Sequence, residues 1–546
     1  MATMKVNQIS RDDLDWQIQY NTDRCTFCGK CVAACPFRAI EAGVEKRRKV
    51  ISDHFTPEPK VQFKTVPVIR QCVGEYNFCR GCGICERVCP NEAIKPVRNE
   101  DSRFGVKYRA TLADPYKRGG RANLATEKRT LDKIKVGRIS QMTDPSLDAS
   151  RHTFDMLAPF GRILPADEMP FDVVDGKLVM NSATPKVNWI YPIIVGDMSI
   201  GALSWRMWEA MAIAVAYLNE QVGLPVRMCS GEGGVPVRLL KSRYLKYVIL
   251  QIASGHFGWN RIINAMPHMQ ELPGGILIKI GQGAKPGDGG LLQAKKVASH
   301  ISEIRGVPKA DLLSPPNHQG LYSIEESVQK MFLSLNSAFK FQVPVAIKVA
   351  ASATSVSVYN NLLRDPYNIV GGFFVDGLAG GTGAANEISL DHTGHPIVSK
   401  LRDCYNAAVH QGKQGQIPLW AAGGLGANWN LAADAFKMMA LGANGVFTGK
   451  LMLQIAGCVG NDHGKCNACN TGLCPVGICT QNPTLVKRLD IDKTAEQIVN
   501  YFIATDNELK KMLAPIGNSS LPVGRSDCLI SVDRAVADRL NIQYSC

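Results

Sequence analysis

The sequence predicts an α/β protein in which a small cysteine-rich module precedes a (β/α)8 TIM barrel. Three observations support this prediction. The spacing C-x2-C-x2-C-x3-C-P occurs twice within the first 90 residues. Beyond residue 150, apolar runs that end in glycine or polar residues alternate with helical stretches. A chain of 546 residues is long enough for about three or four domains.

The composition excludes several classes of protein. With 45% hydrophobic and 20% charged residues, the chain can bury a large core. It contains no apolar run long enough to span a membrane, and its first residues lack the apolar region of a signal peptide. Because 18 clustered cysteines occur without an export signal, we expect metal ligation in a reducing, cytoplasmic compartment rather than disulfides.

The net charge of +14 is concentrated in one segment. Residues 101–140 contain 11 Lys and Arg against 4 Asp and Glu, which is half of the excess. No aromatic-interleaved groove or zinc-finger spacing accompanies them, so we do not expect nucleic-acid binding. A local basic segment more often faces an acidic partner or stays solvated. We therefore expect a docking surface for a partner protein.

The two cysteine quartets predict two [4Fe-4S] clusters. In each quartet, three closely spaced thiolates can surround one face of a cluster, and the fourth, followed by proline, ligates the other cluster. Zinc sites favour paired C-x2-C knuckles instead. The expected ligands are Cys25, Cys28, Cys31 and Cys89 for one cluster and Cys79, Cys82, Cys85 and Cys35 for the other. We expect this ferredoxin-like module to conduct single electrons and its interval 41–70 to be an insertion.

Eight apolar runs predict the strands of the barrel. They lie at residues 189–199, 226–234, 276–284, 311–316, 343–351, 369–377, 417–424 and 444–450. Continuous apolar runs are typical of buried parallel sheet, and the stretches between them carry apolar residues at helical spacing. Residues 247–255 could form a ninth strand. The alternative, a doubly wound sheet, lacks a G-x-G-x-x-G sequence opening a first unit.

The predicted strand ends carry the chemistry, as is usual for such barrels. Several polar residues follow buried strands, where their burial is costly without a ligand or partner. They are Ser199, Glu232, Lys279, Gln282, Lys285, Lys348 and Asp376. The last two units end in Gly423-Gly424 and Thr448-Gly449. Because barrels commonly hold a phosphate after strands seven and eight, this placement predicts FMN; the alternative is that the glycines form ordinary turns.

A third group of cysteines follows the last predicted strand. Cys466, Cys469 and Cys474 are flanked by Cys458 and Cys479. We expect a further Fe-S cluster beside the flavin. A zinc loop or a redox thiol pair are the alternatives.

Several strings resemble the synthase domain of the glutamate synthase family, in the family's order over about residues 151–483. They are MSIGALS (198–204), SGEGG (230–234), ASGHFG (253–258), KIGQGAKPGDGG (279–290), EIRGVPKADLLSPP (303–316), YSIEE (322–326), GGTGAA (380–385) and CPVGICTQNP (474–483). The cysteine-rich module in front resembles that of the archaeal-type large subunit.

The resemblance implies FMN-dependent reductive amination of 2-oxoglutarate by ammonia to glutamate, with electrons arriving through Fe-S clusters. Lys279, Lys285 and Arg305 match family contacts to the dicarboxylate substrate. Gln282 matches a polar substrate contact, and Glu232 matches the carboxylate at the ammonia entry. To flavin binding we assign Ser199, Lys348, Gly423, Gly424, Thr448 and Gly449.

The chain departs from the family pattern near the expected substrate. VDGLAGGTGAA stands at 375–385 where HDGGTGAS is usual, and His256 stands where Arg is usual. The family loop C-x5-C-x4-C is met only at Cys469 and Cys474, so Cys458 or Cys466 would complete a [3Fe-4S] or [4Fe-4S] cluster. The substrate could therefore differ from 2-oxoglutarate.

Two other functions stay open. One is a transferase on the same barrel that condenses glutamate with methylamine, like methylamine–glutamate N-methyltransferase. The other is a non-catalytic electron-transfer subunit. The sequence shows neither a glutaminase domain before the barrel nor a second nucleotide-binding unit for NADPH. We therefore expect an oligomer in which an electron-donor subunit or a ferredoxin supplies electrons, and ammonia comes from solution or a glutaminase-like subunit.

These features divide the chain into four predicted segments. Residues 1–98 form the two-cluster ferredoxin-like domain, and residues 99–150 form a basic linker. Residues 151–483 form the FMN barrel with its Fe-S loop, and residues 484–546 form a C-terminal helical tail.

Overall fold

The structure is a computed structural model, and its description covers part of the chain. The described residues are 16–22, 24–36, 38–51, 60–72, 79, 83–98, 134–136, 171–174, 177–180, 191–286, 289–315, 318, 324–365, 369–380, 385, 392–427, 429–458, 468–517 and 520–545. The predicted basic linker lies outside them except for Ile134–Val136. Cys82 and Cys466 lie outside them as well.

The chain divides into two compact units. The N-terminal unit comprises Met1–Arg121 together with Gly457–Val476. The barrel unit comprises Ala122–Ala456 and Gly477–Cys546. The third group of cysteines thus belongs to the same unit as the two quartets.

The N-terminal unit repeats one small motif twice. Strand β1 (Trp16–Tyr20) pairs antiparallel with β4 (Ile94–Arg98). Two short helices, α1 (Lys30–Ala34) and α2 (Ile84–Val88), each begin after a left-handed glycine that lies within a cysteine quartet. Since glycine adopts positive φ without steric cost, Gly29 and Gly83 allow the chain to turn tightly between successive cysteines. The two halves fold alike, as a two-cluster ferredoxin-like module requires.

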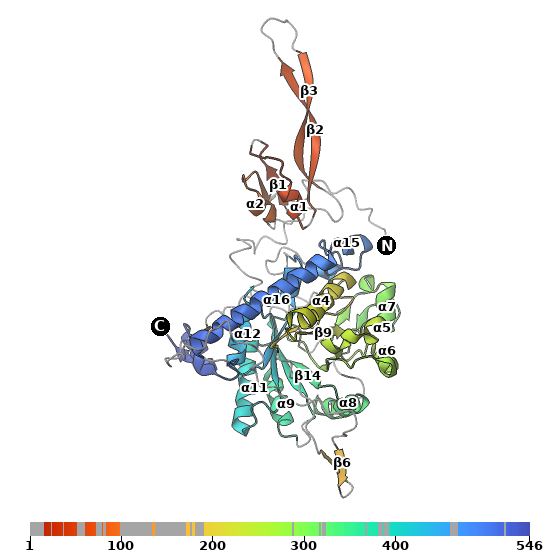
Figure 1. Ribbon diagram of the computed structural model, residues 1–546, viewed down its shortest axis with the longest axis vertical. Helices are drawn as coiled ribbons and strands as arrows, with labels where there is room; N and C mark the ends of the chain where they lie inside the picture. The colour runs from red at the N-terminus through yellow and green to blue at the C-terminus, as the bar shows by residue number, and fades with distance from the viewer. Residues whose placement is uncertain are drawn as a thin grey trace. The chain divides into compact units, whose positions relative to one another are not determined.

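The interval 41–70 folds into a long antiparallel hairpin of β2 (Ile40–Ile51) and β3 (Lys60–Gln71). The strands pair without interruption from Ile40 opposite Gln71 to Ile51 opposite Lys60. Figure 1 shows the two strands extending as a ribbon from the helices of the module. The base is fixed because the Gln71 side chain accepts from the Ile18 amide and donates to the Trp16 carbonyl, at 2.7 and 2.9 Å.

The barrel unit contains a closed barrel of eight parallel strands, so the predicted fold is confirmed. The strands in barrel order are β8 (Ile193–Val195), β9 (Arg227–Glu232), β10 (Val248–Ile252), β11 (Gly275–Lys279), β14 (Val345–Ala350), β15 (Gly372–Asp376), β16 (Leu419–Ala422) and β17 (Gly445–Thr448). The barrel closes where β17 pairs with β8, with Thr448 opposite Val195.

One predicted strand was wrong. Among the described residues 311–315 of that segment, only β13 (Leu312–Leu313) is a strand, and it pairs antiparallel with β12 (Leu291–Leu292) outside the barrel. Its place in the barrel is taken by β10, within the run 247–255 that was kept as a possible ninth strand. All five residues of β10 are buried, whereas Leu313 is exposed.

Apolar side chains fill the barrel interior. One buried cluster takes at least one residue from every strand: Ile194, Cys229, Ile249, Leu277, Ala346, Phe374, Trp420, Ala422 and Phe447. The rings of Phe374 and Trp420 stack at 5.6 Å between centroids, and Phe447 meets Phe374 edge-on at 5.3 Å. The barrel is therefore a packed core, and its chemistry must lie at its open ends.

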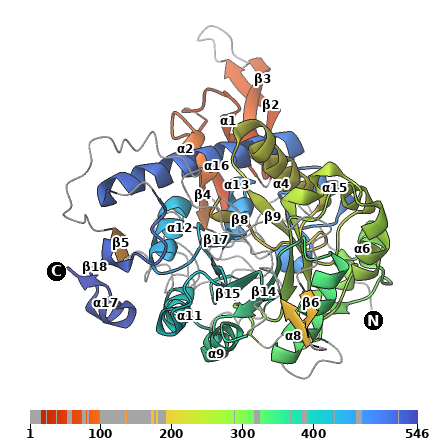
Figure 2. The same cartoon turned by 60° about the horizontal axis from the view of Figure 1, so that its bottom comes forward.

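Helices surround the barrel, as Figure 2 shows. They are α4 (Trp205–Tyr217), α5 (Val237–Leu240), α6 (Trp259–Ala265), α7 (Ser299–Arg305), α8 (Ile324–Ala338), α9 (Ala353–Leu362), α11 (Ile397–Gln411), α12 (Leu431–Ala440) and α13 (Lys450–Ile455). Ser204 caps α4 by accepting from the Met207 amide, and Ser352 and Ser355 form a capping box on α9.

The C-terminal part of the chain packs on the barrel. The long helix α16 (Ile491–Leu513) contacts α4, α12 and α13. Strand β18 (Leu529–Ser531) pairs antiparallel with β5 (Ile134–Val136) and parallel with β19 (Gln543–Tyr544). The segment predicted as a helical tail thus also contributes a small sheet.

The remaining described elements are short. In the barrel unit they are β6 (Phe171–Val174), β7 (Lys177–Met180), α15 (Pro483–Val486), α17 (Arg534–Leu540), η5 (Leu218–Val222), η6 (Arg243–Tyr247), η7 (Met266–His268), η8 (Ala294–Lys296), η10 (Ala514–Ile516) and η11 (Ser526–Cys528). In the N-terminal unit, α14 (Ala468–Thr471) carries Cys469. Among the described residues, no helix has both the length and the apolar character that a membrane span needs.

Candidate functional site

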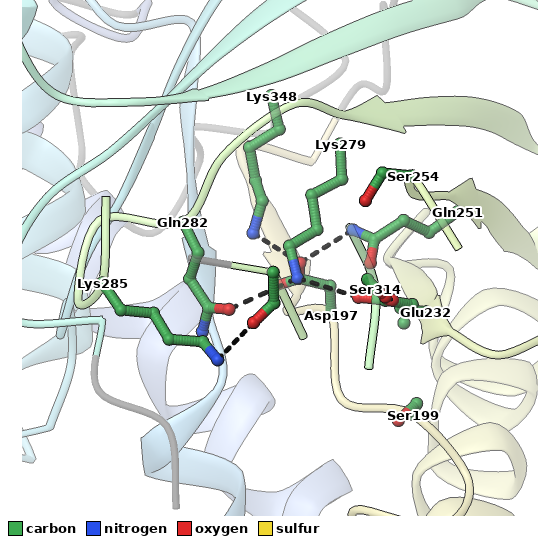
Figure 3. A network of polar contacts seen from close by, with 12 residues as sticks. Asp197, Ser199, Glu232, Gln251, Ser254, Lys279, Gln282, Lys285, Ser314 and Lys348 are labelled. Atoms are coloured by element: carbon green, nitrogen blue, oxygen red, sulfur yellow. Dashed lines mark hydrogen bonds and ion pairs between the residues drawn. The ribbon is translucent and has the colours of Figure 1, made fainter. Parts of the chain in front are cut away.

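The polar residues predicted at the strand ends meet at the C-terminal end of the barrel. Glu232, Lys279 and Asp376 are the last residues of β9, β11 and β15, and Lys348 lies within β14. Parallel strands place their C-terminal ends at the same rim, so residues far apart in sequence come together there. Figure 3 shows the side chains of Glu232, Lys279 and Lys348 converging on one polar network.

Lys279 and Glu232 form the centre of the network. The Lys279 ammonium lies 3.1 Å from Glu232 Oε2 and donates to Gln282 Oε1 at 3.3 Å. The Ser314 hydroxyl donates to the other carboxylate oxygen of Glu232. Burial alone would raise the pKa of Glu232, but Lys279 and Ser314 hold it below its usual value. The predicted residues Glu232, Lys279 and Gln282 are thus in contact, with Glu232 ionised.

Arg305 lies at the same rim but is turned toward the protein. Its guanidinium donates to the Glu232 carbonyl at 3.1 Å and to the Ser199 hydroxyl at 3.3 Å. Burial lowers the pKa of Arg305 to about 10, and only 5% of the residue is exposed. Arg305 therefore brings together the loops after β8 and β9.

Lys348 is held between two carboxylates beneath the centre. Its ammonium lies 2.5 Å from Asp197 Oδ2 and 3.3 Å from Asp376 Oδ2, and 2% of its side chain is exposed. Gln251 donates to the same Asp197 oxygen at 2.7 Å. Burial favours the neutral amine, but the two carboxylates outweigh it and raise the pKa of Lys348 above its usual value. Lys348 is therefore a fixed cation.

Lys285 is buried within its own loop. Its ammonium donates to the Gly289 carbonyl at 2.5 Å, and 4% of the residue is exposed. The sequence also offers Asp288 as a counter-charge, but Asp288 lies outside the described residues. The bond to Gly289 closes the loop that connects β11 to β12.

The glycines predicted to bind phosphate are explained in part by close packing. Gly423 and Gly424 have φ of +122° and +73°. A Cβ on Gly423 would lie 2.8 Å from the Gly377 backbone, and one on Gly424 would lie 2.8 Å from the Ala379 Cβ. The buried Thr448 hydroxyl donates to the Leu425 carbonyl at 2.8 Å. Loop contact alone accounts for both glycines, so their role toward a phosphate stays a prediction.

Three cysteines of the first quartet and one of the second line one cavity. Its lining includes Cys25, Cys28, Cys31 and Cys89, which is the crossed ligand set expected for one cluster. In the described part of the chain, no three Cys, His, Asp or Glu side chains are close enough to share a single metal ion. A cubane cluster binds each thiolate at a different iron and so needs a wider arrangement.

The second quartet shows the same local pattern as the first. Cys79 packs with Cys35, its predicted partner from the other quartet. The amides of Ala39 and Ala93 each donate to the sulfur four residues earlier, Cys35 and Cys89, at 3.2 Å. Hydrogen bonds to thiolates stabilise their charge and tune cluster potentials. Cys82, the remaining predicted ligand, lies outside the described residues.

The third cysteine group is described only in part. Cys474 is buried and Cys469 is half-buried on α14, whereas Cys466 lies outside the described residues. The third cluster and its first ligand stay predictions.

Sequence reasoning missed several members of the network. Asp197 pairs with Lys348, Ser314 donates to Glu232, and Gln251 donates to Asp197. His256 contacts His318 beside them. Asp197 follows a buried apolar strand, the same signal that identified Asp376. Gln251 and Ser314 carry no such signal, because a single neutral polar residue in an apolar run or a turn is common.

Comparisons with known proteins give a consistent result. The family model described as "Conserved region in glutamate synthase" matches residues 138–519, and the "4Fe-4S binding domain" model matches residues 18–41 and 75–95. The archaeal glutamate synthase [NADPH] of Archaeoglobus fulgidus is 30% identical, covering 93% of this chain and 92% of its own. That of Methanocaldococcus jannaschii is 33% identical, covering 79% and 83%. Among solved structures, the flavin-binding domain of baker's yeast flavocytochrome b2 aligns with a TM-score of 0.40 at 12% identity, covering 76% of this chain and 80% of that one.

Proposed function

This chain belongs to the glutamate synthase family, and from that premise we propose that it reductively aminates 2-oxoglutarate to glutamate. The reaction consumes 2-oxoglutarate, ammonium, two electrons and two protons, and it yields glutamate and water. We assign the chemistry to the C-terminal rim of the barrel and electron delivery to the cysteine-rich module. The observation that carries the proposal is the Lys279–Glu232 ion pair, with Gln282 and Ser314 bonded to it.

Lys279 suits a carboxylate substrate. Its ammonium has three donors, and two of them are used on Glu232 and Gln282. The third can pair with a carboxylate of the oxo acid. Because the side chain is 12% exposed, that pairing would take place in a largely water-excluded site, where it is stronger than in water.

Glu232 suits proton handling. It is ionised, and both of its oxygens accept hydrogen bonds from groups that are fixed at the rim. As a carboxylate it can bind ammonium by its charge at the entry, and it can accept a proton as ammonia adds to the carbonyl carbon and the nitrogen becomes more acidic. Gln282 and Lys279 would orient that carbonyl.

The residues present are compatible with FMN. Ser199 and Lys348 would face its ring, and Gly423, Gly424, Thr448 and Gly449 would hold its phosphate. When bound, FMN accepts electrons one at a time from clusters and delivers them as a pair. Two [4Fe-4S] clusters and a third cluster of [3Fe-4S] or [4Fe-4S] type would supply these electrons. Lys348, held by Asp197 and Asp376, would present a fixed ammonium donor to the ring.

The partners belong to the same proposal. An electron-donor subunit or a ferredoxin would reduce the clusters, and the basic residues 101–140 would dock it. Ammonia would come from solution or from a separate glutaminase-like subunit, in a cytoplasmic oligomer. The transferase and electron-transfer alternatives have no described contact that favours them, but the departures at Leu378–Ala379 and His256 make the oxo acid worth testing directly.

The test is a half-reaction on the native complex, purified without oxygen. The flavin is reduced photochemically, and its reoxidation is followed after 2-oxoglutarate plus ammonium is added. We expect reoxidation only when both are present, with one glutamate formed for each flavin. Pyruvate and oxaloacetate serve as controls for the second carboxylate. If methylamine plus glutamate gives a product and 2-oxoglutarate does not, the transferase replaces this proposal.

A further inference from the structure

Two histidines adjoin the active-site lysine and are not used in the chemistry above. His318 Nε2 lies 3.1 Å from the main-chain carbonyl oxygen of Lys279. His318 Nδ1 lies 3.1 Å from His256 Nε2. His318 is buried, at 3% exposed, whereas His256 is exposed to solvent. The two rings therefore form a chain from solvent to the strand end that carries Lys279.

The hydrogen positions in this chain are determined by its inner end. A carbonyl oxygen can only accept, so His318 Nε2 must carry the hydrogen. In a neutral ring His318 Nδ1 then has only a lone pair, and His256 Nε2 must donate to it. Burial lowers the pKa values of both histidines, which favours these neutral rings. His256 Nδ1 is left as the outer nitrogen of the pair.

Ser314 and Pro315, the described residues that precede His318, are fixed to the rim. The Ser314 amide donates to the Gly290 carbonyl at 2.8 Å, and its hydroxyl donates to Glu232. The Ser254 hydroxyl, after β10, donates to the Pro315 carbonyl. His318 thus lies a few residues after two anchored positions and contacts the main chain of Lys279.

The carbonyl that His318 contacts belongs to Lys279, at the junction between a barrel strand and the loop of the candidate site. Lys279 is the last residue of β11, and the loop with Gln282 and Lys285 begins directly after it. The next amide, Ile280, donates to the Lys348 carbonyl at 2.9 Å, so the strand end is fixed on its other side as well. A rotation of this peptide would move the Lys279 ammonium away from Glu232.

We propose that His256 and His318 form a positioning dyad that fixes the main chain of Lys279 and, through it, the Lys279–Glu232 pair. This inference deepens the proposed function and rests on it for its catalytic readout.

The hydrogen bond between the two rings survives protonation at only one of their nitrogens, His256 Nδ1. A proton on His256 Nδ1 leaves the bond between the rings in place. A proton on His318 Nδ1 removes the lone pair that accepts from His256, and that bond is lost. The charged groups on the neighbouring elements are Glu232 on β9, Lys279 on β11 and Arg305 on α7. Burial lowers the pKa of His318 and is the largest effect; the hydrogen bond to the Lys279 carbonyl and the charge of Glu232 raise it, and His256 lowers it.

The direction of the pH effect follows. A histidine whose pKa is lowered by folding contributes stability above its unfolded value, about 6.5, and loses it as pH falls through the folded value. We therefore expect the dyad to be intact at neutral pH and to open below about pH 6.5.

The experiment compares variants of the full-length holoenzyme. His318→Gln keeps a donor in the place of Nε2 but does not titrate, whereas His318→Leu has no donor. His256→Gln and His256→Leu repeat the comparison at the exposed position, in case a buried leucine prevents folding. His410→Leu, at the exposed end of α11, is the matched control.

Two readouts are measured across pH. The first is acylation of Lys279 by an amine-reactive ester, followed by mass spectrometry and normalised to the exposed Lys340. The second is kcat and KM for 2-oxoglutarate. In His318→Leu we expect Lys279 labelling to rise, and kcat/KM to fall, by about tenfold, the factor that corresponds to one lost buried hydrogen bond. His318→Gln should match the unmodified protein at neutral pH and should lose the decline below about pH 6.5.

Each outcome separates the two claims. Equal labelling in His318→Leu and His318→Gln, or an unchanged acid decline in His318→Gln, overturns the dyad. If the unmodified protein does not turn over 2-oxoglutarate, the proposed function fails, and the labelling results still decide whether the dyad positions Lys279.

Discussion

Asp197 and Asp376 share one lysine yet have opposite pKa shifts. Burial acts against the charge of both. For Asp197, contacts with Lys348 and Gln251 outweigh burial and hold its pKa below the usual value. Asp376 lies farther from Lys348, at 3.3 rather than 2.5 Å, and close to the Asp197 charge, so burial raises its pKa. The two carboxylates must therefore differ in what they contribute to stability.

We expect Asp197→Asn to destabilise the protein at pH 7 by about 1.5–3 kcal/mol, the usual contribution of a hydrogen bond to a charged group. A carboxyl whose pKa is lowered by folding stabilises above its unfolded value near 4 and loses this as pH falls, so the cost should shrink toward about pH 3. Because folding raises the pKa of Asp376, its ionisation lowers the free energy of unfolding at pH 7. Asp376→Asn is thus the matched control, and urea unfolding at pH 7 should show a smaller loss or a gain. Equal losses at pH 7 would contradict this assignment.

Lys285→Ala tests whether the buried ammonium binds the substrate or only holds its own loop through the Gly289 carbonyl. Under the proposed function, this variant keeps its flavin but no longer reoxidises it with 2-oxoglutarate and ammonium. Lys413→Ala is a matched control, because Lys413 also donates to a main-chain carbonyl, that of Leu363, outside the candidate site. Both variants should lose about 1–3 kcal/mol of stability. Unchanged reoxidation in Lys285→Ala would assign the lysine to the loop alone.

Single residues were predictable where a charge follows a buried strand. Lys279, Glu232 and Lys348 were found this way, because a charge at the end of a buried apolar run is costly unless a ligand or a partner compensates it. The contacts they make were not predictable. Lys348 was assigned to the flavin, and its two carboxylate partners lie just after β8 and at the end of β15, which the chain brings together only when the barrel closes.

At the scale of elements, the loop between β11 and β12 shows how glycine permits close packing at the site. A Cβ on Gly289 would lie 1.7 Å from the Ser314 carbonyl oxygen, which is backbone. A Cβ on Gly290 would lie 2.6 Å from Glu232 Oε2, which is a side chain. A side chain at Gly289 would therefore have to displace backbone, whereas one at Gly290 would have to displace only a side chain.

Gly289→Ala and Gly290→Ala should consequently fail in different ways. The first must displace the backbone that carries Ser314, so we expect it to destabilise the protein by about 1–3 kcal/mol, as overpacking does. The second needs only a rotation of Glu232, so it should keep most of its stability but lose activity. Thermal unfolding and 2-oxoglutarate turnover distinguish them. A Gly290→Ala variant with full activity would show that the position of Glu232 is not critical.

Elements were predictable as apolar runs, but their partners were not. Seven of the eight predicted runs and the spare run at 247–255 hold the eight barrel strands. The run at 311–316 was misassigned because Leu312 and Leu313 meet another pair of leucines in an antiparallel bridge. An apolar run shows that a segment prefers burial; it does not show which strand it pairs with or in which direction.

At the scale of the whole molecule, the cysteine pattern predicts the iron content. Two [4Fe-4S] clusters and a third cluster require roughly 11 or 12 iron atoms per chain. Cys474→Ser should remove the third cluster and leave about eight. Cys404→Ser, at a buried cysteine of α11 in the barrel unit, should leave iron unchanged. About four iron atoms in the unmodified protein would rule out the three-cluster assignment.

The hairpin of β2 and β3 begins and ends at the same place. Ile40 is paired with Gln71, and the Cys72 amide donates to the Ala39 carbonyl at 2.9 Å. The apolar residues that pack near the clusters, Ile40 and Ile69, lie at this base. The distal part of the hairpin lengthens the chain, but the first and last residues of the hairpin stay paired with each other at the base.

Because its two ends are already paired, the hairpin could be shortened without changing the path of the chain on either side of it. Replacing residues 44–67 by Asn-Gly would join Gly43 to Val68, which already face each other, through a two-residue turn of the preferred type. We expect the shortened protein to keep its iron content and cluster absorbance. Loss of the clusters would mean that the distal ribbon helps to hold them. If they are kept, the same junction can accept a reporter or an affinity tag in place of the ribbon, close to the two cysteine quartets but outside them.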